Sequence, residues 1–320
     1  MNHRSLKAAV VAALMTVGAA AGGIANAAVP KNLPMPSGSP SGEDVANQVY
    51  FVNHFFAVKN FSIEEVGDAI TILINRAADS DPTTITLERY LNNDYPDGDP
   101  VWSKDLAIFK SGKLRGTGML ITDFSEAGKS QAYAIWLPAL RKIRRFAEPA
   151  HDDSWGGSDF TFGDVTLRKP EHEKHEVTGK ETFNDCLGVM DVPAAQRNKY
   201  MGDLPASDCS AKGKEVYVLK STTKFDNWWY DYRVSYVDTK TFADYRTEYF
   251  KGGKKIKVID RSWGSMELSD PRAQYWSSWY GKDLNTNHET WAVIPRSVIK
   301  WDSDKPESLW SERTLRQIRR

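Results

Sequence analysis

The sequence predicts a β-dominated α+β protein in which helices cover a curved antiparallel sheet. Two segments with helical periodicity come first, and beyond residue 80 the apolar pattern changes from a period of 3.6 residues to a period of 2. The later strands are joined by short turns, as in an antiparallel meander. Because one apolar face of such a sheet must be buried, the early helices are its expected cover. With no internal repeat and no break in composition, residues 43–320 are predicted to form one domain.

Residues 1–27 have the features of a cleavable export signal. Arg4 and Lys7 precede an apolar run over residues 8–21, and Ala25-Asn26-Ala27 is a small-residue cleavage pattern. An anchoring helix is disfavoured, because the run is shorter than the roughly 20 strongly apolar residues of a membrane span. We therefore expect a periplasmic protein with no transmembrane span after cleavage. Residues 28–42 alternate Pro with Gly and Ser, which predicts an extended, unpacked leader.

The helices are predicted from capping residues and apolar spacing. The first begins near Glu43, after Ser41 or Gly42 as the N-cap. Its apolar residues fall at helical spacing, at Val45, Val49, Val52 and Phe56. Ser62 and Glu65 form a capping box that predicts a second helix, reaching about residue 78. A closing helix or tail is expected over residues 309–320.

The strands are predicted from alternation and turn residues. They cover residues 84–90, 105–110, 116–122, 131–137, 141–146, 215–222, 230–238, 242–250, 255–262 and 290–298. Gly252 and Gly253 supply the positive φ angles that a tight hairpin requires. A long curved sheet packed on helices often leaves a cavity between the two layers, and such a cavity is expected here.

The two cysteines, Cys186 and Cys209, lie in the exported part of the chain, where an oxidising compartment favours a disulfide between them. The segment between them contains two Pro and two Gly and is predicted to be a loop. A metal pair and a catalytic thiol are the competing interpretations. Neither is favoured, because the spacing is not CxxC and no neighbouring His is present to activate a thiol.

Composition and motifs favour a binding protein over an enzyme. Lys+Arg and Asp+Glu are both 42, so no cationic excess indicates nucleic-acid binding. His172 and His175 have the spacing His-Glu-Lys-His rather than HExxH, so no metal site is expected. Neither GxSxG nor GxGxxG is present, and no cofactor is expected. Asp152, Asp153 and Asp159 leave a hydrolase as a weaker alternative.

Two stretches stand out from this background. The segment WLPALRKIRR, residues 136–145, predicts a hairpin with an exposed cationic stripe, and GSDFTFGD, residues 157–164, is a Gly-rich turn followed by aromatic residues. With Gly116-Thr117-Gly118, YVDTKTFADYRTEYF at residues 236–250 and GGKKIKV after it, these stretches resemble the outer-membrane lipoprotein-sorting protein family. The resemblance is to its LolA-like periplasmic carriers, which are associated with transporters of the resistance-nodulation-division type.

The resemblance implies an incomplete β-barrel that holds acyl chains in an apolar cavity closed by helices. The chain has no Cys directly after the signal that could be acylated, and so does not resemble the acylated outer-membrane acceptor. Strand alternation predicts the cavity lining as Met119, Ile121, Ile135, Leu137, Phe160, Tyr232, Val234, Tyr245 and Tyr249. The stripe of Arg141, Arg144 and Arg145 is the predicted contact for a lipid headgroup or a partner protein.

The resulting hypothesis is a periplasmic carrier of lipid or of lipoprotein acyl chains in outer-membrane biogenesis. Its expected partner is an inner-membrane transporter of the resistance-nodulation-division type. The alternative is a sensor or adaptor of the same fold that binds a protein partner. Each buried methylene contributes about 0.8 kcal/mol, so burial of one acyl chain is a sufficient driving force for a carrier.

Overall fold

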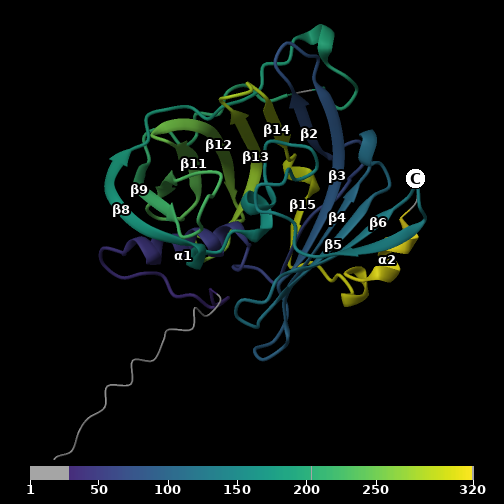
Figure 1. Cartoon of the computed structure of the whole chain (residues 1–320), viewed down its shortest axis with the longest axis horizontal. Helices are drawn as coiled ribbons and strands as arrows, with labels where there is room; N and C mark the ends of the chain where they lie inside the picture. Colours follow the sequence, from purple (N-terminus) through teal and green to yellow (C-terminus); the bar gives the residue numbers. More distant parts are fainter. Residues whose placement is uncertain (1–28, 203, 319–320) are drawn as a thin grey trace, which may run out of the picture.

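The computed structural model describes residues 29–202 and 204–318 (Figure 1). The predicted export signal lies outside these residues. The helices are α1 (Gly42–Asn53) and α2 (Glu312–Gln317). The strands are β1 (Asn60–Ile63), β2 (Thr71–Arg76), β3 (Thr83–Asn92), β4 (Val101–Phe109), β5 (Gly118–Phe124), β6 (Ala132–Leu137), β7 (Lys142–Phe146), β8 (Glu173–Thr182), β9 (Glu215–Thr223), β10 (Tyr232–Asp238), β11 (Asp244–Lys251), β12 (Lys254–Ser265), β13 (Gln274–Asp283), β14 (Glu289–Val293) and β15 (Ile299–Trp301). Short helical turns are η1 (Gly112–Leu114), η2 (Gly163–Leu167), η3 (Pro170–His172), η4 (Ala194–Gln196), η5 (Arg296–Val298) and η6 (Glu307–Leu309).

The strands form one large antiparallel sheet that curves without closing, as an incomplete barrel. Its order is β7-β6-β5-β4-β3-β2-β14-β13-β12-β11-β10-β9-β8, and β1 joins β3 to β15. Along this order every pair is of chain neighbours, except where β2 pairs with β14 and so unites the N-terminal and C-terminal halves. The two ends of the sheet are β7 and β8, which the chain connects directly. That connection, residues 147–172, is therefore placed to cross the interior.

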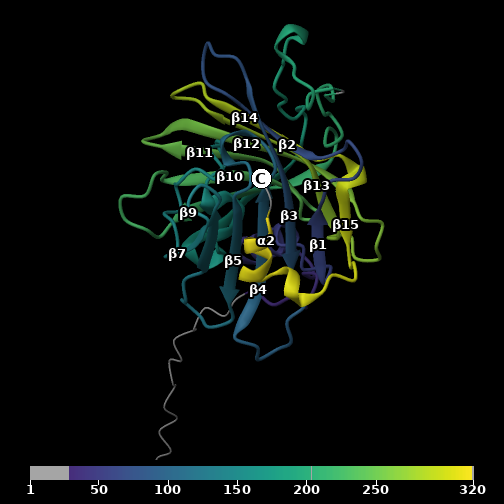
Figure 2. The same ribbon diagram turned by 90° about the vertical axis from the view of Figure 1, so that its right-hand side faces the viewer.

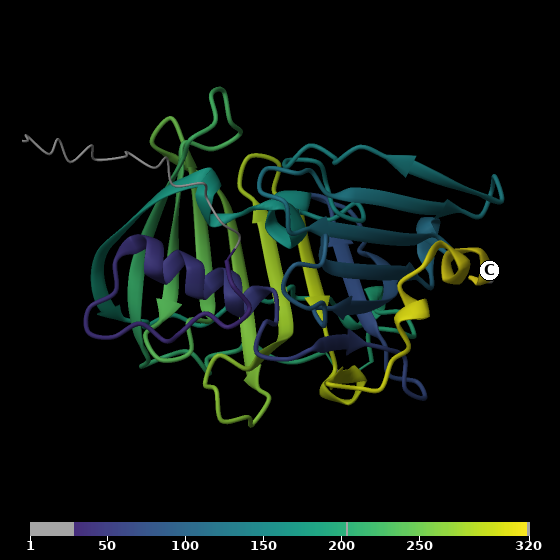
Figure 3. The same cartoon turned by 90° about the horizontal axis from the view of Figure 1, so that it is seen from below.

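The first predicted helix is confirmed as α1. Ser41 caps it through a capping box, in which its hydroxyl accepts from the Asp44 N–H and the Asp44 carboxylate accepts from the Ser41 N–H. Val45 and Phe51 on its buried face pack against Leu219 of β9. Figure 3 shows α1 lying across the strands of this half of the sheet, where it contacts β8 and β9.

The second predicted helix is wrong, because its residues form β1 and β2. The run Thr71–Asn75 is buried on both faces, with Leu73 in the main core and Ile72 and Ile74 beneath the disulfide loop. A strand buried on both faces has a continuous apolar sequence, which periodicity cannot distinguish from a buried helix. The short closing helix is confirmed as α2, which contacts β5, β6 and β7; Figure 2 shows it beside β5. Leu315 of α2 packs on Leu106 and Leu120.

Three further strands, β8, β13 and the short β15, were not predicted, and the leader is packed rather than free. β8 is a charged end strand, and β13 contains an irregularity that breaks its alternation. Residues 29–40 have no regular structure, but Val29 is buried beside α1, and Gln48 of α1 donates to the Pro34 carbonyl at 2.8 Å. This hydrogen bond from the Gln48 side chain and the apolar contact of Val29 together hold the extended leader against the domain.

The predicted disulfide between Cys186 and Cys209 is confirmed. The loop that it closes lies over the outer face of the sheet, where Met190, Val192 and Met201 pack on Trp291 of β14. The predicted Gly252-Gly253 hairpin between β11 and β12 is also confirmed, with φ of 56° and 75°. No helix in the described part of the chain is long and apolar enough to span a membrane.

Candidate ligand-binding interior

The connection between β7 and β8 folds into the interior of the incomplete barrel. We call residues 154–168 the plug. A bridge between Ser154 and Thr161 closes a tight turn through Gly156 and Gly157, both with positive φ. The turn is followed by η2, a π-helical segment. Trp155, Phe160 and Leu167 of the plug all belong to the main hydrophobic core. The GSDFTFGD stretch therefore forms the centre of the plug.

The plug packs directly on the backbone of β13. A Cβ added at Gly281 would lie 2.8 Å from Cε1 of Phe160 and 3.3 Å from Cβ of Asp159. No residue other than glycine therefore fits at position 281 while the plug is in place. The Asp159 carboxylate accepts from Thr290 Oγ1 at 2.8 Å and contacts Nδ1 of His288 at 2.6 Å, which fixes the tip of the plug to β14 and its preceding turn.

Two small compartments lie on either side of the plug. The first, which we call the tryptophan compartment, has a volume of about 50 Å³. Its walls are mainly apolar: Ile63, Thr71, Leu73, Leu87, Arg89, Trp155, Phe160, Val165, Trp276, Trp279, Ala292 and Ile294. The indole N–H groups of Trp155, Trp276 and Trp279 have no hydrogen-bond partner. Ligand cavities usually measure about 300–1,000 Å³, so this compartment is too small to hold a lipid in the structure.

The second compartment, which we call the polar compartment, lies between α1 and the plug and has a volume of about 60 Å³. Its charged lining residues are Asp164, Arg168, Lys169, Arg233, Asp244 and Arg261. Val165 of the plug and Trp276 of β13 line both compartments. The two compartments are thus separated by the side chains of Val165, which belongs to the plug, and Trp276, which belongs to β13. A displacement of the plug would join them into one amphipathic cavity.

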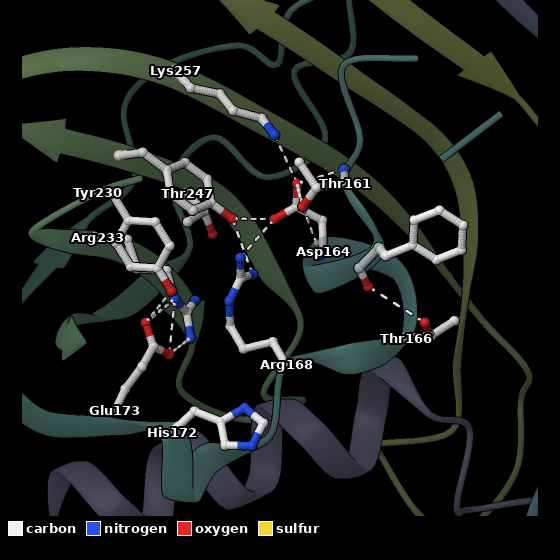
Figure 4. A network of polar contacts seen from close by, with 12 residues as sticks. Thr161, Asp164, Thr166, Arg168, His172, Glu173, Tyr230, Arg233, Thr247 and Lys257 are labelled. Carbon is white, nitrogen blue, oxygen red and sulfur yellow. Dashed lines mark hydrogen bonds and ion pairs between the residues drawn. The ribbon is translucent and has the colours of Figure 1, made fainter. Parts of the chain in front are cut away.

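Asp164 is the centre of the polar contacts between plug and sheet (Figure 4). One carboxylate oxygen accepts from Arg168 at 2.9 Å and from the Tyr249 hydroxyl at 2.6 Å. The other accepts from Lys257 Nζ at 2.7 Å and from the N–H and hydroxyl of Thr161 at 3.0 Å. Burial alone would raise the pKa of the Asp164 carboxyl. The charges of Lys257 and Arg168 outweigh this effect and hold that pKa well below its usual range.

A second buried ion pair joins β8 to β10. Arg233 donates to both oxygens of Glu173, with the shortest contact at 2.6 Å, and the Tyr230 hydroxyl donates to the same carboxylate at 2.9 Å. Burial opposes ionisation of Glu173, but Arg233 outweighs it and lowers the Glu173 pKa to about 2. This pair is charge-balanced, and its bidentate geometry fixes the end strand β8 to its neighbours.

Arg261 of β12 is only partly satisfied. One terminal nitrogen of its guanidinium donates to Asp244, whose other carboxylate oxygen accepts from Asn53 of α1 at 2.9 Å. The Arg261 side chain is only 5% exposed, and its Nε is a buried donor with no hydrogen-bond partner in the chain. The guanidinium carbon lies 4.0 Å from the centroid of the Trp279 ring. Arg261 thus borders both the charged network and the tryptophans.

Most of the predicted lining residues lie in the interior. Met119, Ile121, Phe160 and Tyr249 are buried in the main core, and Ile135 packs against it. Of these, Phe160 also lines the tryptophan compartment, and the Tyr249 hydroxyl contacts Asp164. The structure therefore brings together residues of β5, β6, β11 and the plug as strand alternation predicts.

Tyr245, Tyr232 and Val234 lie elsewhere. Tyr236 pairs with Arg246 and Val237 with Asp244, so Tyr245 is an extra residue in β11, and this bulge places it beneath the disulfide loop. On β10 the inner positions are polar: Ser235 is buried, whereas Val234 is half-buried and Tyr232 stacks on Phe250. The prediction took the apolar face of β10, with Tyr232 and Val234, to face the interior. The opposite, polar face with Ser235 is the one that is buried. Leu137 is half-buried at the end of β6.

The predicted cationic stripe is exposed but divided between two faces. Arg141 is at the hairpin turn, with φ of 49°. Arg144 pairs with Ile135 in the register of β6 and β7 and therefore shares its face. Arg145 lies on the opposite face, where it forms an ion pair with Glu312 of α2 at 2.6 Å. The exposed Leu140 completes the tip of the hairpin.

The weaker candidates have structural contacts. Nδ1 of His175 contacts Ser221 at 2.8 Å and Nε2 contacts the Pro170 carbonyl at 2.9 Å. His172 packs instead against His151, with ring centroids 5.3 Å apart. The described residues contain no group of three or more His, Cys, Asp or Glu that could hold a metal ion. Asp153 accepts from the Ala150 N–H in a turn at 3.1 Å, and Asp159 holds the plug as described above.

Sequence reasoning missed the tryptophans of β13 and the buried cations. Trp263 pairs with Trp276 and Ser262 with Ser278, so Ser277 is an extra residue that brings Trp276 and Trp279 onto one face, with ring centroids 4.8 Å apart. The available signal was that Trp276 and Trp279 are three residues apart within a β-rich region. A regular strand would place them on opposite faces, so only an irregular strand brings them together. Arg233, Lys257 and Arg261 gave no such signal, because charged residues in a strand ordinarily face solvent.

Comparisons with known proteins identify the fold. A family model described as an uncharacterized protein matches residues 103–202. A search of curated proteins finds no significant match. A Vibrio parahaemolyticus structure described as an outer membrane lipoprotein-sorting protein domain is 16% identical, with a TM-score of 0.62 over 86% of this chain and 98% of that one. A DUF1329 family protein from Desulfovibrio piger is 13% identical, with a TM-score of 0.63 over 87% and 100%. A LolA superfamily protein from Nitrosomonas europaea is 11% identical, with a TM-score of 0.52 over 86% and 100%.

Proposed function

Since the chain has the LolA-like fold of the lipoprotein-sorting proteins, we propose that it is a periplasmic carrier that holds a lipid, or the acyl chains of a lipoprotein, inside its incomplete barrel. The observation that carries the proposal is the pair of compartments separated by the plug. The tryptophan compartment offers apolar surface, and the polar compartment offers charged groups within the same interior. Such a cavity suits an amphipathic ligand better than a purely apolar one.

The carrier must open to take up its cargo. With volumes of about 50 and 60 Å³, neither compartment holds an acyl chain in the structure. The plug is the part that can move, because it is a connection between two end strands rather than a strand of the sheet. Its outward displacement would expose Trp276 and Trp279 and join the two spaces. The methylenes buried in exchange, at about 0.8 kcal/mol each, would offset the lost plug contacts.

Cargo uptake is tested by quenching of tryptophan fluorescence with a brominated fatty acid. Saturable quenching is expected, since Trp155, Trp276 and Trp279 line the compartment. Ala292→Phe fills that space and should weaken uptake by about tenfold or more. Ala206→Phe, at an exposed position in the disulfide loop, is the matched control and should bind like the wild type. Equal binding by both variants, or no binding by the wild type, would refute the proposed site.

The hairpin β6–β7 is the proposed contact with an inner-membrane exporter of the resistance-nodulation-division type. It presents Arg141, Arg144 and the exposed Leu140 on the end strand of the sheet, and no further strand of the described residues pairs with β7. These features suit an acidic segment of the exporter. The double variant Arg141→Glu and Arg144→Glu should lose exporter binding in pull-down while keeping lipid uptake, whereas reversal of the exposed Lys212 and Lys254 should not. Retained exporter binding by the hairpin variant would refute this contact.

A further inference from the structure

The buried network around Asp164 carries more positive than negative charge. Among the described residues, its salt bridges join Asp164 to both Arg168 and Lys257, and Glu173 to Arg233. Three cations therefore share two carboxylates. Tyr249 supplies no further negative charge, because burial raises the pKa of its phenol. An unneutralised charge is costly to bury, since the interior solvates it less well than water does.

The neighbouring ion pairs do not supply the missing anion. Arg261 is matched by Asp244, Arg89 by Asp105 with a closest contact of 2.6 Å, and Lys169 by Asp123 at 3.5 Å. Among these ion-paired residues, the cations therefore outnumber the carboxylates by one. Arg168, Lys169, Arg233 and Arg261 all line the polar compartment. The surplus therefore lies beside the polar compartment.

A separate observation points to the same compartment. The Nε of Arg261 is a buried donor with no acceptor, and the side chain is 95% buried, given its 5% exposure. Buried donors are nearly always paired, so the Nε of Arg261 is free to donate to an acceptor from outside the chain, such as a ligand oxygen. Arg261 also lies over Trp279, which lines the tryptophan compartment. An acceptor at Arg261 would thus continue into the apolar space.

We propose, resting on the carrier function above, that the cargo is an anionic amphiphile whose carboxylate or phosphate binds in the polar compartment beside Arg168 and Arg261 while its apolar chain occupies the tryptophan compartment. The anion neutralises the surplus charge and accepts from Arg261 Nε. Val165, the plug residue common to both compartments, must shift to let one molecule span them. Acyl chains of a lipoprotein carry no charge of their own, so this site favours an ionised lipid over such chains.

The test compares three ligands with the same acyl chain on delipidated protein: a fatty acid, a lysophosphatidic acid and an uncharged monoacylglycerol. Displacement of a fluorescent fatty acid gives each affinity. Both anionic ligands should bind about tenfold or more tighter than the monoacylglycerol, because each adds a charge-assisted hydrogen bond. The tighter of the two anions identifies whether the headgroup is a carboxylate or a phosphate.

The decisive variant is Lys257→Met, which removes the surplus charge and leaves Asp164 paired with Arg168. It should still fold, because Asp164 keeps Arg168 and the Tyr249 hydroxyl as partners, and it should lose most of the tenfold preference. Lys254→Met removes the same charge at an exposed position of the same strand and should retain the preference. If Lys257→Met does not fold, Arg261→Lys, which keeps the charge paired with Asp244 but lacks the guanidinium Nε donor, should also lower the preference.

The outcomes are distinct. Equal affinity of the wild type for charged and uncharged ligands overturns the anionic site but leaves the carrier function standing. An undiminished preference in both Lys257→Met and Arg261→Lys also overturns it. Failure of all three ligands to bind refutes the carrier function itself.

Discussion

Lys257 of β12 and Asp164 of the plug form a buried ion pair with an Nζ–Oδ2 distance of 2.7 Å, in which both side chains are at least 94% buried, given exposures of 6% and 0%. It joins a strand of the sheet to the segment that fills the interior, across 93 residues of sequence. The plug is therefore held by directional polar contacts at Asp164 and by apolar packing at Phe160. The polar contacts and the apolar packing can be weakened by separate substitutions, so the contribution of each to holding the plug in the interior can be measured.

Asp164→Asn should destabilise the protein strongly. The amide cannot neutralise Arg168 and Lys257, so two buried cations lose their counter-charge, and breaking a buried ion pair costs about 3–5 kcal/mol. The free energy of unfolding from urea denaturation measures the loss. Adding Lys257→Met to Asp164→Asn should recover part of it, because one unpaired cation is removed. A double variant no more stable than the single variant would contradict this electrostatic explanation.

Gly281→Ala should loosen the plug. The new Cβ would lie 2.8 Å from Phe160, so the plug must move away from β13, at a cost of about 1–3 kcal/mol. Faster amide hydrogen exchange confined to residues 154–168 is the expected signature. Gly179→Ala in β8 is the control, because no atom lies within 4 Å of its added Cβ. Equal exchange in the two variants would show that the plug does not rest on Gly281.

Stability should fall as the pH drops from about 6.5 to about 4, because of buried histidines. Burial lowers the pKa of His54 from its ordinary value of about 6.5 to about 4, so in this window the unfolded chain binds a proton that the folded chain does not. His54 alone should account for a loss of about 3 kcal/mol, which is absent above pH 6.5. His54→Phe should flatten the pH dependence of the unfolding free energy. An unchanged slope between pH 6.5 and 4 would contradict the assignment.

The disulfide should contribute about 3 kcal/mol to stability, through the loop that it closes in the unfolded state. Cys186→Ser with Cys209→Ser should lower the thermal midpoint accordingly. Lipid uptake should be retained, because the loop packs on the outer face of the sheet at Trp291 and not in the interior. Loss of uptake in a variant that remains folded would show that the loop acts on the cavity.

Much of the sheet could be predicted from the sequence, because its strands are antiparallel neighbours with clear alternation. The hairpin at Gly252 and Gly253 and the disulfide partners followed from local chemistry alone. The failures have physical causes. β2 is buried on both faces and so resembled a helix, and the bulges at Tyr245 and Ser277 interrupt the alternation from which facing was predicted.

The site was predicted only where its interior is apolar. Met119 and Ile121 lie in the core as predicted, because apolar residues of a strand face it, but of the three only Phe160 of the plug lines a compartment. Arg233 and Lys257 were not predicted, since each is buried only because a carboxylate distant in sequence neutralises it. A single sequence does not show which charged residues are paired across the fold. The function of the 157–164 stretch as a plug was equally hidden, because it depends on β7 and β8 being the two ends of the sheet.

The most direct test of the account is native mass spectrometry of the protein purified from a periplasm without detergent, followed by extraction and identification of any bound lipid. The account predicts one lipid per protein, with an ionised carboxylate or phosphate and at least one acyl chain. A protein that is empty and also fails to take up a fluorescent fatty acid would contradict the carrier function, and a bound lipid without charge would contradict the anionic site.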